Sequence, residues 1–584
     1  MSTKLSPSIH VRIAEFFRTD TLKLLLLLFL IALLLRVIGI NYGYLHGDER
    51  INSAAKVLSG QFIPDQHFYP PLFNYINAVF FAALYAVGRL IPLWYDIEGF
   101  RAAYFSTPDI FYFTARFVTA LSAAMVAPLF FIAARLAGSS RTGSIAAAIL
   151  GATLPIGIYL SHIAKSDVPL ATTVVLTLVL LQLKYLKPQD RLLDCLIGFT
   201  LALGFSFKQS FIFIAVPLAL FHLFYAWRYR PEILKLTTVA RIGGVFLTAL
   251  VVLNLAIILD WQKFLTYQAI QSQMSVRSLG NVFSSFWSWA EFVASTSRGT
   301  TIPSAAAFAA FPFLFLRKGW MPEAALPLVP SWGAIASGTM LVIVITGGRQ
   351  QEGLWIPFFT AMHLFSAVII ACLIDHGRTR AGIAGRTGFV LILMLSITGI
   401  GRIWTEAQAQ PLSIDLAHIV SETYRDRKIL TSTLIDLPQR REAQQMEIAR
   451  DRHLAEKYKV ELPELSPEKI ITASAPGAVY YVKRPVVMFG LENADDTAME
   501  GIVQAHAWPL QRPEWKLDYW LERDFDVFVI SSLDYELHEV NSQIMRGFAK
   551  ELVERCDVAR KLEARKPLFL ETDVTILDCA GARR

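Results

Sequence analysis

Long runs of apolar residues dominate the first two thirds of the chain. A helix needs about 20 apolar residues to cross a hydrocarbon core of roughly 30 Å. Segments that meet or approach that length, each bounded by charged residues, cover 24–40, 117–134, 142–161, 168–183, 195–207, 209–227, 242–259, 299–316, 324–348, 353–374 and 387–401. The pattern therefore predicts a polytopic α-helical membrane protein, with eleven spans inside residues 1–402.

Residues 72–88 form a further apolar segment, which fits either a twelfth span or a helix lying at the membrane interface. The positive-inside rule favours the interfacial helix. With that choice the loops after 134, 183, 227, 316 and 374, which hold most of the Lys and Arg, fall on one side of the membrane. The opposite short loops then hold only Lys165, Lys208 and Arg349. We therefore expect a cytoplasmic N-terminus, with the first loop (41–116) and the C-terminal segment on the outer face.

The sequence from 403 to 584 has a different composition. A charged helical pattern covers 439–458, and short β-type runs cover 428–434, 469–473, 485–490, 526–531 and 572–578. Strands alternating with helices predict a small α/β domain. Cys556 and Cys579 lie in this domain and would form a disulfide if it is outside the cytoplasm.

Composition agrees with a membrane protein. Hydrophobic residues make up 54% of the chain and charged residues 18%, against about 25% charged in soluble domains. This excludes a soluble enzyme, a disordered chain and a disulfide scaffold. The net charge of +7 is explained by cytoplasmic loops that meet anionic lipid headgroups, so we expect no nucleic-acid partner.

The first group of candidate catalytic residues follows the first span directly, as His46-Gly47-Asp48-Glu49-Arg50. Two adjacent carboxylates are not needed for packing at that place. A structural alternative is that Asp48 caps a helix beginning at Glu49, whose charge the helix dipole would favour. The two interpretations are compatible, because a helix start also fixes a carboxylate in space.

Two further motifs lie in the predicted outer loops. Tyr69-Pro70-Pro71-Leu72, preceded by His67, stiffens the chain before the interfacial helix. The connection at 161–169 contains His162, Lys165 and Asp167 within a few residues. Its structural alternative is an interfacial cap, in which Asp167 begins the next helix and Pro169 occupies its first turn.

The predicted topology brings these groups to one face of the membrane, together with Arg116, Lys208 and Arg349. Ionisable groups at that depth are costly and mark function more often than packing, although Lys and Arg also reach from helix ends to water. A carboxylate can take a proton from an acceptor hydroxyl, and basic groups or a metal can stabilise a departing phosphate. We therefore expect a reaction on a phosphate-bearing lipid.

In their order along the chain, these motifs resemble the GT-C superfamily, in particular the protein O-mannosyltransferase and aminoarabinose-transferase-like branch. The motif order covers roughly residues 20–230, from HGDER through YPPL and Ala115-Arg116-Phe117 to SHIAKSDVPL. The resemblance implies a polyprenyl-phosphate-linked sugar donor and inversion at the anomeric carbon. It also implies that Asp48 is the catalytic base with Glu49 beside it, that Asp167 is the second-loop acid, and that His162 binds metal or substrate.

One position departs from the aminoarabinose branch, where a Lys commonly precedes the Pro-Pro and faces the lipid phosphate. Here that position is Tyr69, which leaves Lys165, Arg116 and Lys208 as candidates to replace the missing cation. The segment 348–357 resembles the family's late outer loop, in which an Arg precedes a Pro-containing span. Arg349 is thus another candidate ligand for the donor phosphate.

Several alternatives stay open. His46, Asp48, His162 and Asp167 would supply ligands for a divalent metal ion if their loops meet, and His67 is a further metal or substrate candidate. The acceptor is a lipid, a polysaccharide or a protein. Other function classes are a lipid-linked sugar flippase and a non-catalytic envelope assembly protein. A bacterial inner membrane with a periplasmic site is the expected location, although a lumen-facing endoplasmic reticulum enzyme obeys the same physics.

Overall fold

The computed structural model describes residues 19–42, 49, 51–64, 67–106, 109–275, 282–295, 301–316, 320–424, 427–432, 478–482, 516–522, 524–532, 542–569 and 571–583. The chain divides into two compact units. Unit 1 comprises Met1–Asn41, Gly47–Leu90 and Asp109–Thr405, and unit 2 comprises Tyr42–His46, Ile91–Pro108 and Glu406–Arg584. Predicted residues His46 and Asp48 lie outside the described residues, as do the predicted helix at 439–458 and the predicted strands at 469–473 and 485–490.

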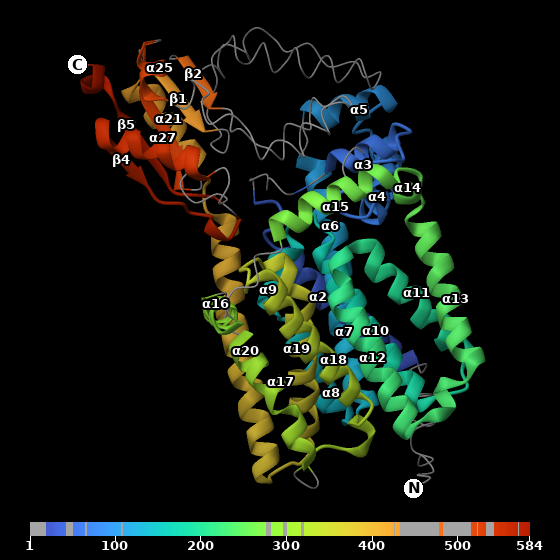
Figure 1. Ribbon diagram of the computed structural model, residues 1–584. Helices are drawn as coiled ribbons and strands as arrows, with labels where there is room; N and C mark the ends of the chain where they lie inside the picture. Colours follow the sequence, from blue (N-terminus) through green and yellow to red (C-terminus); the bar gives the residue numbers. More distant parts are fainter. Residues whose placement is uncertain are drawn as a thin grey trace. The chain divides into compact units, whose positions relative to one another are not determined.

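Unit 1 is helical (Figure 1). Its helices in the first half of the chain are α2 (Thr19–Val37), α3 (Ile51–Leu58), α4 (Leu72–Leu90), α6 (Asp109–Ala124), α7 (Val126–Leu136), α8 (Arg141–Ala152), α9 (Pro155–Ser161), α10 (Asp167–Leu186), α11 (Arg191–Phe207), α12 (Ile212–Tyr229) and α13 (Leu236–Leu253). Then follow α14 (Leu255–Leu259), α15 (Trp261–Ser275), α16 (Val282–Ser295), α17 (Thr301–Leu316), α18 (Leu328–Thr346), α19 (Glu352–Ile374) and α20 (Arg380–Gln408).

The predicted fold class is confirmed, since each of the eleven predicted spans lies on a helix or a bent helix pair. By length and composition, eight described helices are able to cross a membrane, or nine if the bent pair α8–α9 counts as one span. The apolar helix α17 is shorter, α11 has 17 residues, and α2 carries Asp20, Lys23 and Arg36. Helix α4, predicted at the interface, is itself long and apolar enough to span, so its placement stays a prediction.

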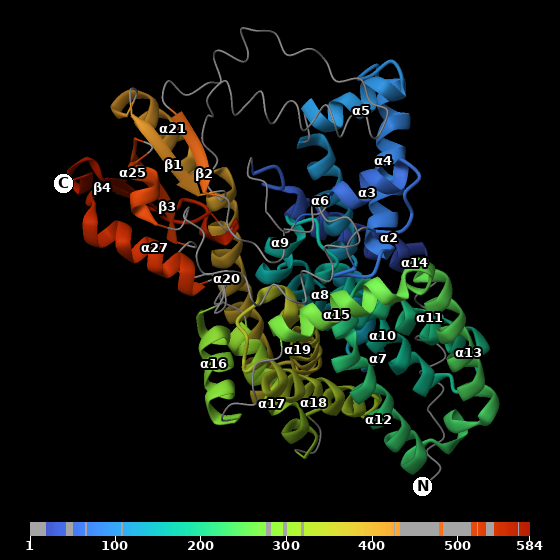
Figure 2. The same cartoon turned by 45° about the horizontal axis from the view of Figure 1, so that its top comes forward.

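Helix α19 lies in the core of the bundle. It packs against α8, α10 and α17, and every residue of its most apolar window is buried. This burial agrees with its sequence, because a helix that is apolar on all sides belongs inside a bundle. Helix α13 is the opposite case: it packs along α11 (Figure 2), and only 6% of its apolar window is buried within the protein.

Arg36 of α2 stabilises the break between α8 and α9, which bend by 46°. Pro155 has no N–H to donate to the carbonyl of Gly151, so the helix ladder is interrupted there. The buried Arg36 donates instead, from Nη2 to the Gly151 oxygen at 3.3 Å and from Nη1 to the Ala152 oxygen at 2.9 Å. The break redirects the chain into α9 and thus into the predicted motif around His162.

Unit 2 contains a five-stranded sheet of order β2-β1-β3-β5-β4. Its strands are β1 (Lys428–Ser432), β2 (Ala478–Val482), β3 (Phe525–Ser531), β4 (Asp557–Leu562) and β5 (Val574–Asp578). Strands β2, β1 and β3 are parallel, whereas β5 is antiparallel to both β3 and β4. Strands β1, β3 and β5 confirm three of the predicted β-type runs, while β2 and β4 were not predicted.

Helices pack on both faces of this sheet, as the alternation of β3 requires. Phe528 and Ile530 join one apolar cluster with α25 (Leu517–Leu521) and α27 (Ser542–Arg555). Val527 and Val529 join another with α21 (Leu412–Thr423). Cys556 and Cys579 form a disulfide in the first cluster. The predicted α/β domain is thus present in the tail.

Candidate active site

Glu49 and Arg116 form a buried ion pair in unit 1. Arg116 of α6 donates from Nε to Glu49 Oε1 at 2.7 Å and from Nη2 to Oε2 at 2.6 Å. The backbone N–H of Ala164 also donates to Oε1, at 2.8 Å. Such charge-assisted, bidentate contacts fix a carboxylate in its ionised form and in one orientation. Glu49 therefore joins the segment after α2 to α6 and to the α9–α10 connection.

The remaining contacts of Arg116 extend this junction. Its Nη1 donates to the carbonyl of Ile40 at 3.2 Å, and its guanidinium carbon lies 5.6 Å from the centre of the Tyr112 ring. The sequence offered Arg116 as a ligand of a donor phosphate. The structure gives it a carboxylate partner, Glu49, and its role toward a phosphate stays a prediction.

A second buried ion pair joins Asp167 and Lys208. Asp167 begins α10, and Lys208 lies at the end of α11 in extended backbone. Lys208 Nζ is 2.5 Å from Asp167 Oδ1, and Lys165 Nζ is 4.0 Å from Oδ2. Two ammonium groups thus lie beside one carboxylate, where α10 begins and α11 ends.

Tyr69 completes this cluster from the first loop. Lys208 Nζ lies 5.5 Å from the centre of the Tyr69 ring, within the range of a cation–π contact. By the resemblance described above, Tyr69 stands where the aminoarabinose branch commonly has a Lys. Lys208 therefore places a cation beside the Tyr69 ring.

The late loop reaches the same cluster through Gly353, in the first turn of α19. Lys208 Nζ donates to the Gly353 carbonyl at 3.4 Å. A Cβ at position 353 would lie 2.6 Å from Asp167 Oδ2, closer than real Cβ contacts allow. A side chain at this position would force the carboxylate to shift, so glycine lets the backbone of α19 pack directly against Asp167. Tyr69, Lys165, Asp167, Lys208 and Gly353, from four separate loops, make up what we call the Asp167 cluster.

His162 and Asp167 lie in the connection that both ion pairs share. His162 is buried, and its Nε2 donates to the carbonyl of Ile38 at 2.9 Å. Burial lowers the pKa of His162 to about 4, so the ring is neutral at neutral pH. These contacts anchor the connection to the end of α2.

His67 and Arg349 have separate surroundings. His67 is buried and its Nε2 lies 2.8 Å from Oδ2 of Asp260, the residue before α15. Arg349 lies four residues before Gly353, and its carbonyl accepts a bond from Nε1 of the buried Trp355 at 2.8 Å. The printed sequence gave no sign of Asp260 as a partner, because it is 193 residues from His67.

The described residues do not fit a metal site. No group of three or more His, Cys, Asp or Glu able to hold an ion occurs among them. Asp167 already faces an ammonium at 2.5 Å, and the Nε2 of His162 is committed to a carbonyl. The metal expectation for His46 and Asp48 falls outside the described residues and stays a prediction, so no chemical step is derived through a metal.

Sequence reasoning missed the backbone contributions to the site. The N–H of Ala164 and the carbonyl of Gly353 complete the two ion pairs, yet main-chain groups leave no trace in residue type. The glycine itself was a usable signal, since a Gly in the first turn of an apolar helix marks close backbone approach.

The family model for dolichyl-phosphate-mannose-protein mannosyltransferases matches residues 25–270. No curated protein matches the chain. This part of the chain contains both ion pairs, the YPPL motif and the connection around His162.

Solved structures of membrane glycosyltransferases are also similar. ArnT from Cupriavidus metallidurans bound to undecaprenyl phosphate is 13% identical, with 94% of this chain and 97% of that chain covered and a TM-score of 0.45. The archaeal oligosaccharyltransferase AglB from Archaeoglobus fulgidus, in complex with an inhibitory peptide and a dolichol-phosphate, is 11% identical, with coverages of 92% and 72% and a TM-score of 0.44. Arabinofuranosyltransferase AftD from Mycobacteria is 15% identical, with coverages of 87% and 36% and a TM-score of 0.36. The predicted resemblance to the protein O-mannosyltransferase branch of the GT-C superfamily is confirmed by the family match over residues 25–270.

Proposed function

We propose that the chain is an inverting glycosyltransferase that moves a hexosyl or pentosyl group from a polyprenyl-phosphate donor to an acceptor on the outer face of the membrane. The observation that carries the proposal is the Asp167 cluster. Its charged groups come from two connections, 41 residues apart in sequence, and they meet the more distant Tyr69 and Gly353 beside the connection held by Glu49. A surface patch of unrelated charges would not need such a convergence.

Lys208 is the proposed ligand of the donor phosphate, with Lys165 beside it. Its ammonium is held between Asp167 and the Tyr69 ring, so it is oriented before the donor arrives. A phosphate that leaves with negative charge is stabilised by preorganised cations in a site that excludes water. Asp167 offsets part of the positive charge in the empty site and keeps Lys208 in place.

Asp48 is the proposed catalytic base. It would take the proton of an acceptor hydroxyl while that oxygen attacks the anomeric carbon, and the carbon–oxygen bond to the phosphate breaks on the opposite face. Attack and departure on opposite faces invert the anomeric centre. Glu49 and Arg116 are the proposed positioning residues for this base, because their buried pair fixes the side chain next to it in sequence.

An outer-face site is supported by two features. The short loops with few basic residues are those that carry the site, as the positive-inside rule requires. The Cys556–Cys579 disulfide of the tail agrees with an oxidising compartment. We therefore propose a periplasmic site in a bacterial inner membrane.

A lipid-linked sugar flippase is the second candidate. Transporters place ionisable groups in broken helices near the middle of the membrane. A buried cation, Arg36 of α2, does reach the α8–α9 break, but its side chain donates to backbone carbonyls released by the break. Its contacts are those of a structural group, so the transferase is favoured over the flippase and over a non-catalytic assembly protein.

The test is transfer from labelled polyprenyl-phosphate sugars by the purified full-length protein in lipid, with a small panel of sugars. Lys208→Gln should lower transfer at limiting donor by at least tenfold. Lys263→Gln in α15 is the matched control for loss of a positive charge and should retain activity. Transfer of the sugar to the acceptor by the Lys208→Gln protein at the wild-type rate would contradict the proposed role.

A further inference from the structure

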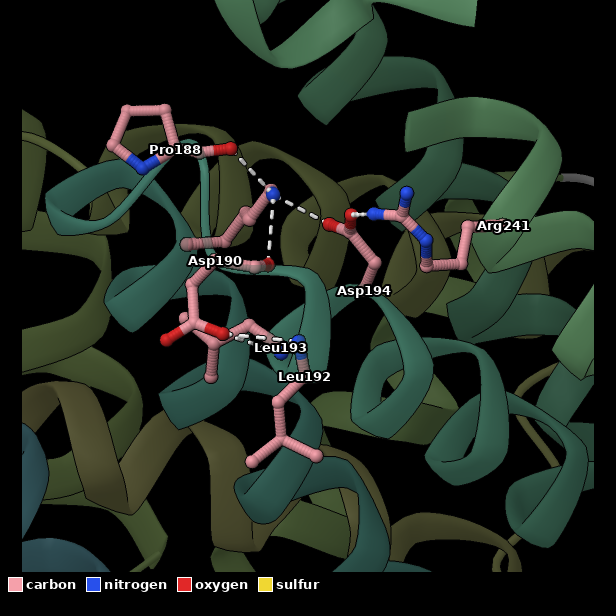
Figure 3. A network of polar contacts seen from close by, with 7 residues as sticks. Pro188, Asp190, Leu192, Leu193, Asp194 and Arg241 are labelled. Atoms are coloured by element: carbon pink, nitrogen blue, oxygen red, sulfur yellow. Dashed lines mark hydrogen bonds and ion pairs between the residues drawn. The ribbon is translucent and has the colours of Figure 1, made fainter. Parts of the chain in front are cut away.

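A second buried charged cluster lies at the other end of α10 and α11, away from the Asp167 cluster. Lys184 is in the last turn of α10 and Asp194 in the first turn of α11. Figure 3 shows the Asp194 carboxylate facing the guanidinium of Arg241, which lies near the start of α13. Lys184 Nζ pairs with Asp194 Oδ1, and Arg241 Nη1 donates to Oδ2 at 2.6 Å. The proposed transfer reaction uses none of these groups.

The two cations differ in how far their hydrogen bonds are satisfied. Besides Asp194, Lys184 Nζ donates to the carbonyls of Pro188 and Asp190, at 2.6 and 3.4 Å. Lys184 thus has an ion pair and two backbone acceptors around one ammonium. Arg241 has one hydrogen-bonded partner in the described part of the chain, Asp194, which leaves Nε and Nη2 without one.

Charge shows the same imbalance. Lys184 and Arg241 both pair with the Asp194 carboxylate, whereas the nearby Asp190 carboxylate accepts from the N–H groups of Leu192 and Leu193, so these ion pairs leave one positive charge. Lys184 and Asp194 are almost fully buried, whereas the side chain of Arg241 is 29% exposed. The uncompensated charge therefore reaches the protein surface at Arg241, where an anion could complete its hydrogen bonds.

Packing between α11 and α13 holds the guanidinium in place. Gly198 lies one turn after Asp194, and a Cβ there would be 2.5 Å from the carbonyl of Ile242. The two backbones thus touch directly beside the ion pair. On α13, a Cβ added at Gly243 or Gly244 would meet no atom within 4 Å, so the surface next to Arg241 is open.

We propose that Arg241 binds the phosphate of an anionic membrane phospholipid, with Asp194 and Lys184 holding the guanidinium in position. Arg241 lies within the first two turns of α13, an apolar helix that is buried over only 6% of its most apolar window. Phosphate groups of the lipid occupy this depth, and an arginine fork binds phosphate through two parallel hydrogen bonds. Basic pockets between transmembrane helices on the cytoplasmic side recognise anionic headgroups in this way.

The site is distinct from the proposed donor site. The donor cluster lies at the start of α10 and the end of α11, and the new site lies at the opposite ends of both helices. A 20-residue helix such as α10 spans about 30 Å, so one lipid molecule does not place its phosphate in both sites. Lipid binding at Arg241 and sugar transfer can therefore be measured separately.

The test uses the full-length protein purified in detergent and titrated with equal amounts of phosphatidylglycerol and phosphatidylcholine. Native mass spectrometry counts each bound lipid. We expect the wild type to retain phosphatidylglycerol about fivefold over phosphatidylcholine at its tightest site, equivalent to about 1 kcal/mol. Arg241→Gln should abolish the preference. Arg191→Gln, which removes an exposed arginine at the start of α11, should leave it unchanged.

Three results would overturn the proposal. The first is a wild type that shows no preference for phosphatidylglycerol over phosphatidylcholine, and the second is an Arg241→Gln protein that keeps this preference. The third is displacement of the lipid by millimolar inorganic phosphate, which would make the site one for free phosphate. If Arg241→Gln fails to fold, Arg241→Lys replaces it. Lysine keeps the charge but not the fork, so the preference should fall by about half or more while the protein remains monodisperse. An unchanged preference in the lysine variant would contradict phosphate recognition by the fork.

Discussion

Arg116 and Glu49, 67 residues apart in sequence, form a buried bidentate ion pair. The Ala164 N–H adds a third hydrogen bond to the Glu49 carboxylate. The adjacent acid–acid motif thus combines two tasks. One carboxylate is fixed by protein groups, and the other is the proposed base.

Glu49→Gln should destabilise the protein, because it leaves the guanidinium of Arg116 buried without its counter-ion. Breaking one member of a buried pair costs about 3–5 kcal/mol. The midpoint of thermal unfolding should therefore fall clearly. The double variant Glu49→Gln, Arg116→Met should recover part of that midpoint, but not the transfer activity. A single variant as stable as the wild type would show that the pair is not a structural junction.

Gly353→Ala should impair transfer without unfolding the protein. The new Cβ would lie 2.6 Å from Asp167 Oδ2, so the carboxylate must shift and release Lys208. We expect transfer to fall by at least tenfold. Gly401→Ala in α20 is the matched control, since a Cβ there meets nothing within 4 Å. Equal activity of both variants would contradict the close packing at Asp167.

A charge exchange tests whether Lys208 supplies the cation that position 69 lacks. Lys208→Gln should raise the donor KM more than it lowers kcat, because a phosphate ligand is lost. Adding Tyr69→Lys should restore part of the donor affinity, since the two side chains lie side by side. Restoration should be absent when Lys is placed at exposed Phe62 instead. No rescue by Tyr69→Lys in a folded protein would argue against a shared phosphate site.

His162 should make stability depend on pH. Burial lowers its pKa to about 4 from an ordinary value near 6.5. Between these values the unfolded chain binds more protons than the folded one, so stability falls as the pH drops from about 6.5 to about 4. His162→Gln, which can still donate to the Ile38 carbonyl, should flatten this dependence of the unfolding midpoint. A parallel decline in both proteins would assign the effect to other groups.

The disulfide of unit 2 gives a test of orientation. Cys556 and Cys579 should resist alkylation in intact cells unless a reductant is added, whereas a reduced tail would be modified at once. Removing the cross-link by Cys556→Ser should also lower stability, by about 2–4 kcal/mol for a native disulfide. Ready labelling without reductant would contradict an outer tail.

The spans and the motifs of the site were predictable from sequence because their signals are local. Apolar runs bounded by charges marked each membrane helix, and Asp167 and Lys208 stood out as ionisable groups at helix ends. Their pairing was not predictable, because it depends on how α10 and α11 pack. The same holds for the ion pair between Arg116 and Glu49, which depends on how α6 packs.

The tail was predicted less completely. Strand β3 has the apolar, β-branched sequence of a buried strand, and it was found. Strand β4 reads Asp-Val-Ala-Arg-Lys-Leu and is exposed over most of its length, as an edge strand can be, so its composition resembles that of a loop. Its pairing with β5 supplies the structure that the sequence pattern does not indicate.

The most direct test of the proposed transfer is made with Asp48→Asn. Wild-type and variant proteins, both full length and in lipid, are supplied with labelled polyprenyl-phosphate sugars while folding is checked by the unfolding midpoint. Asp109→Asn at the start of α6 controls for loss of an outer-face carboxylate. We expect turnover by the wild type and the control, and a loss of at least a hundredfold in Asp48→Asn, in line with removal of a general base. Full turnover by a folded Asp48→Asn protein would contradict the assignment of the base.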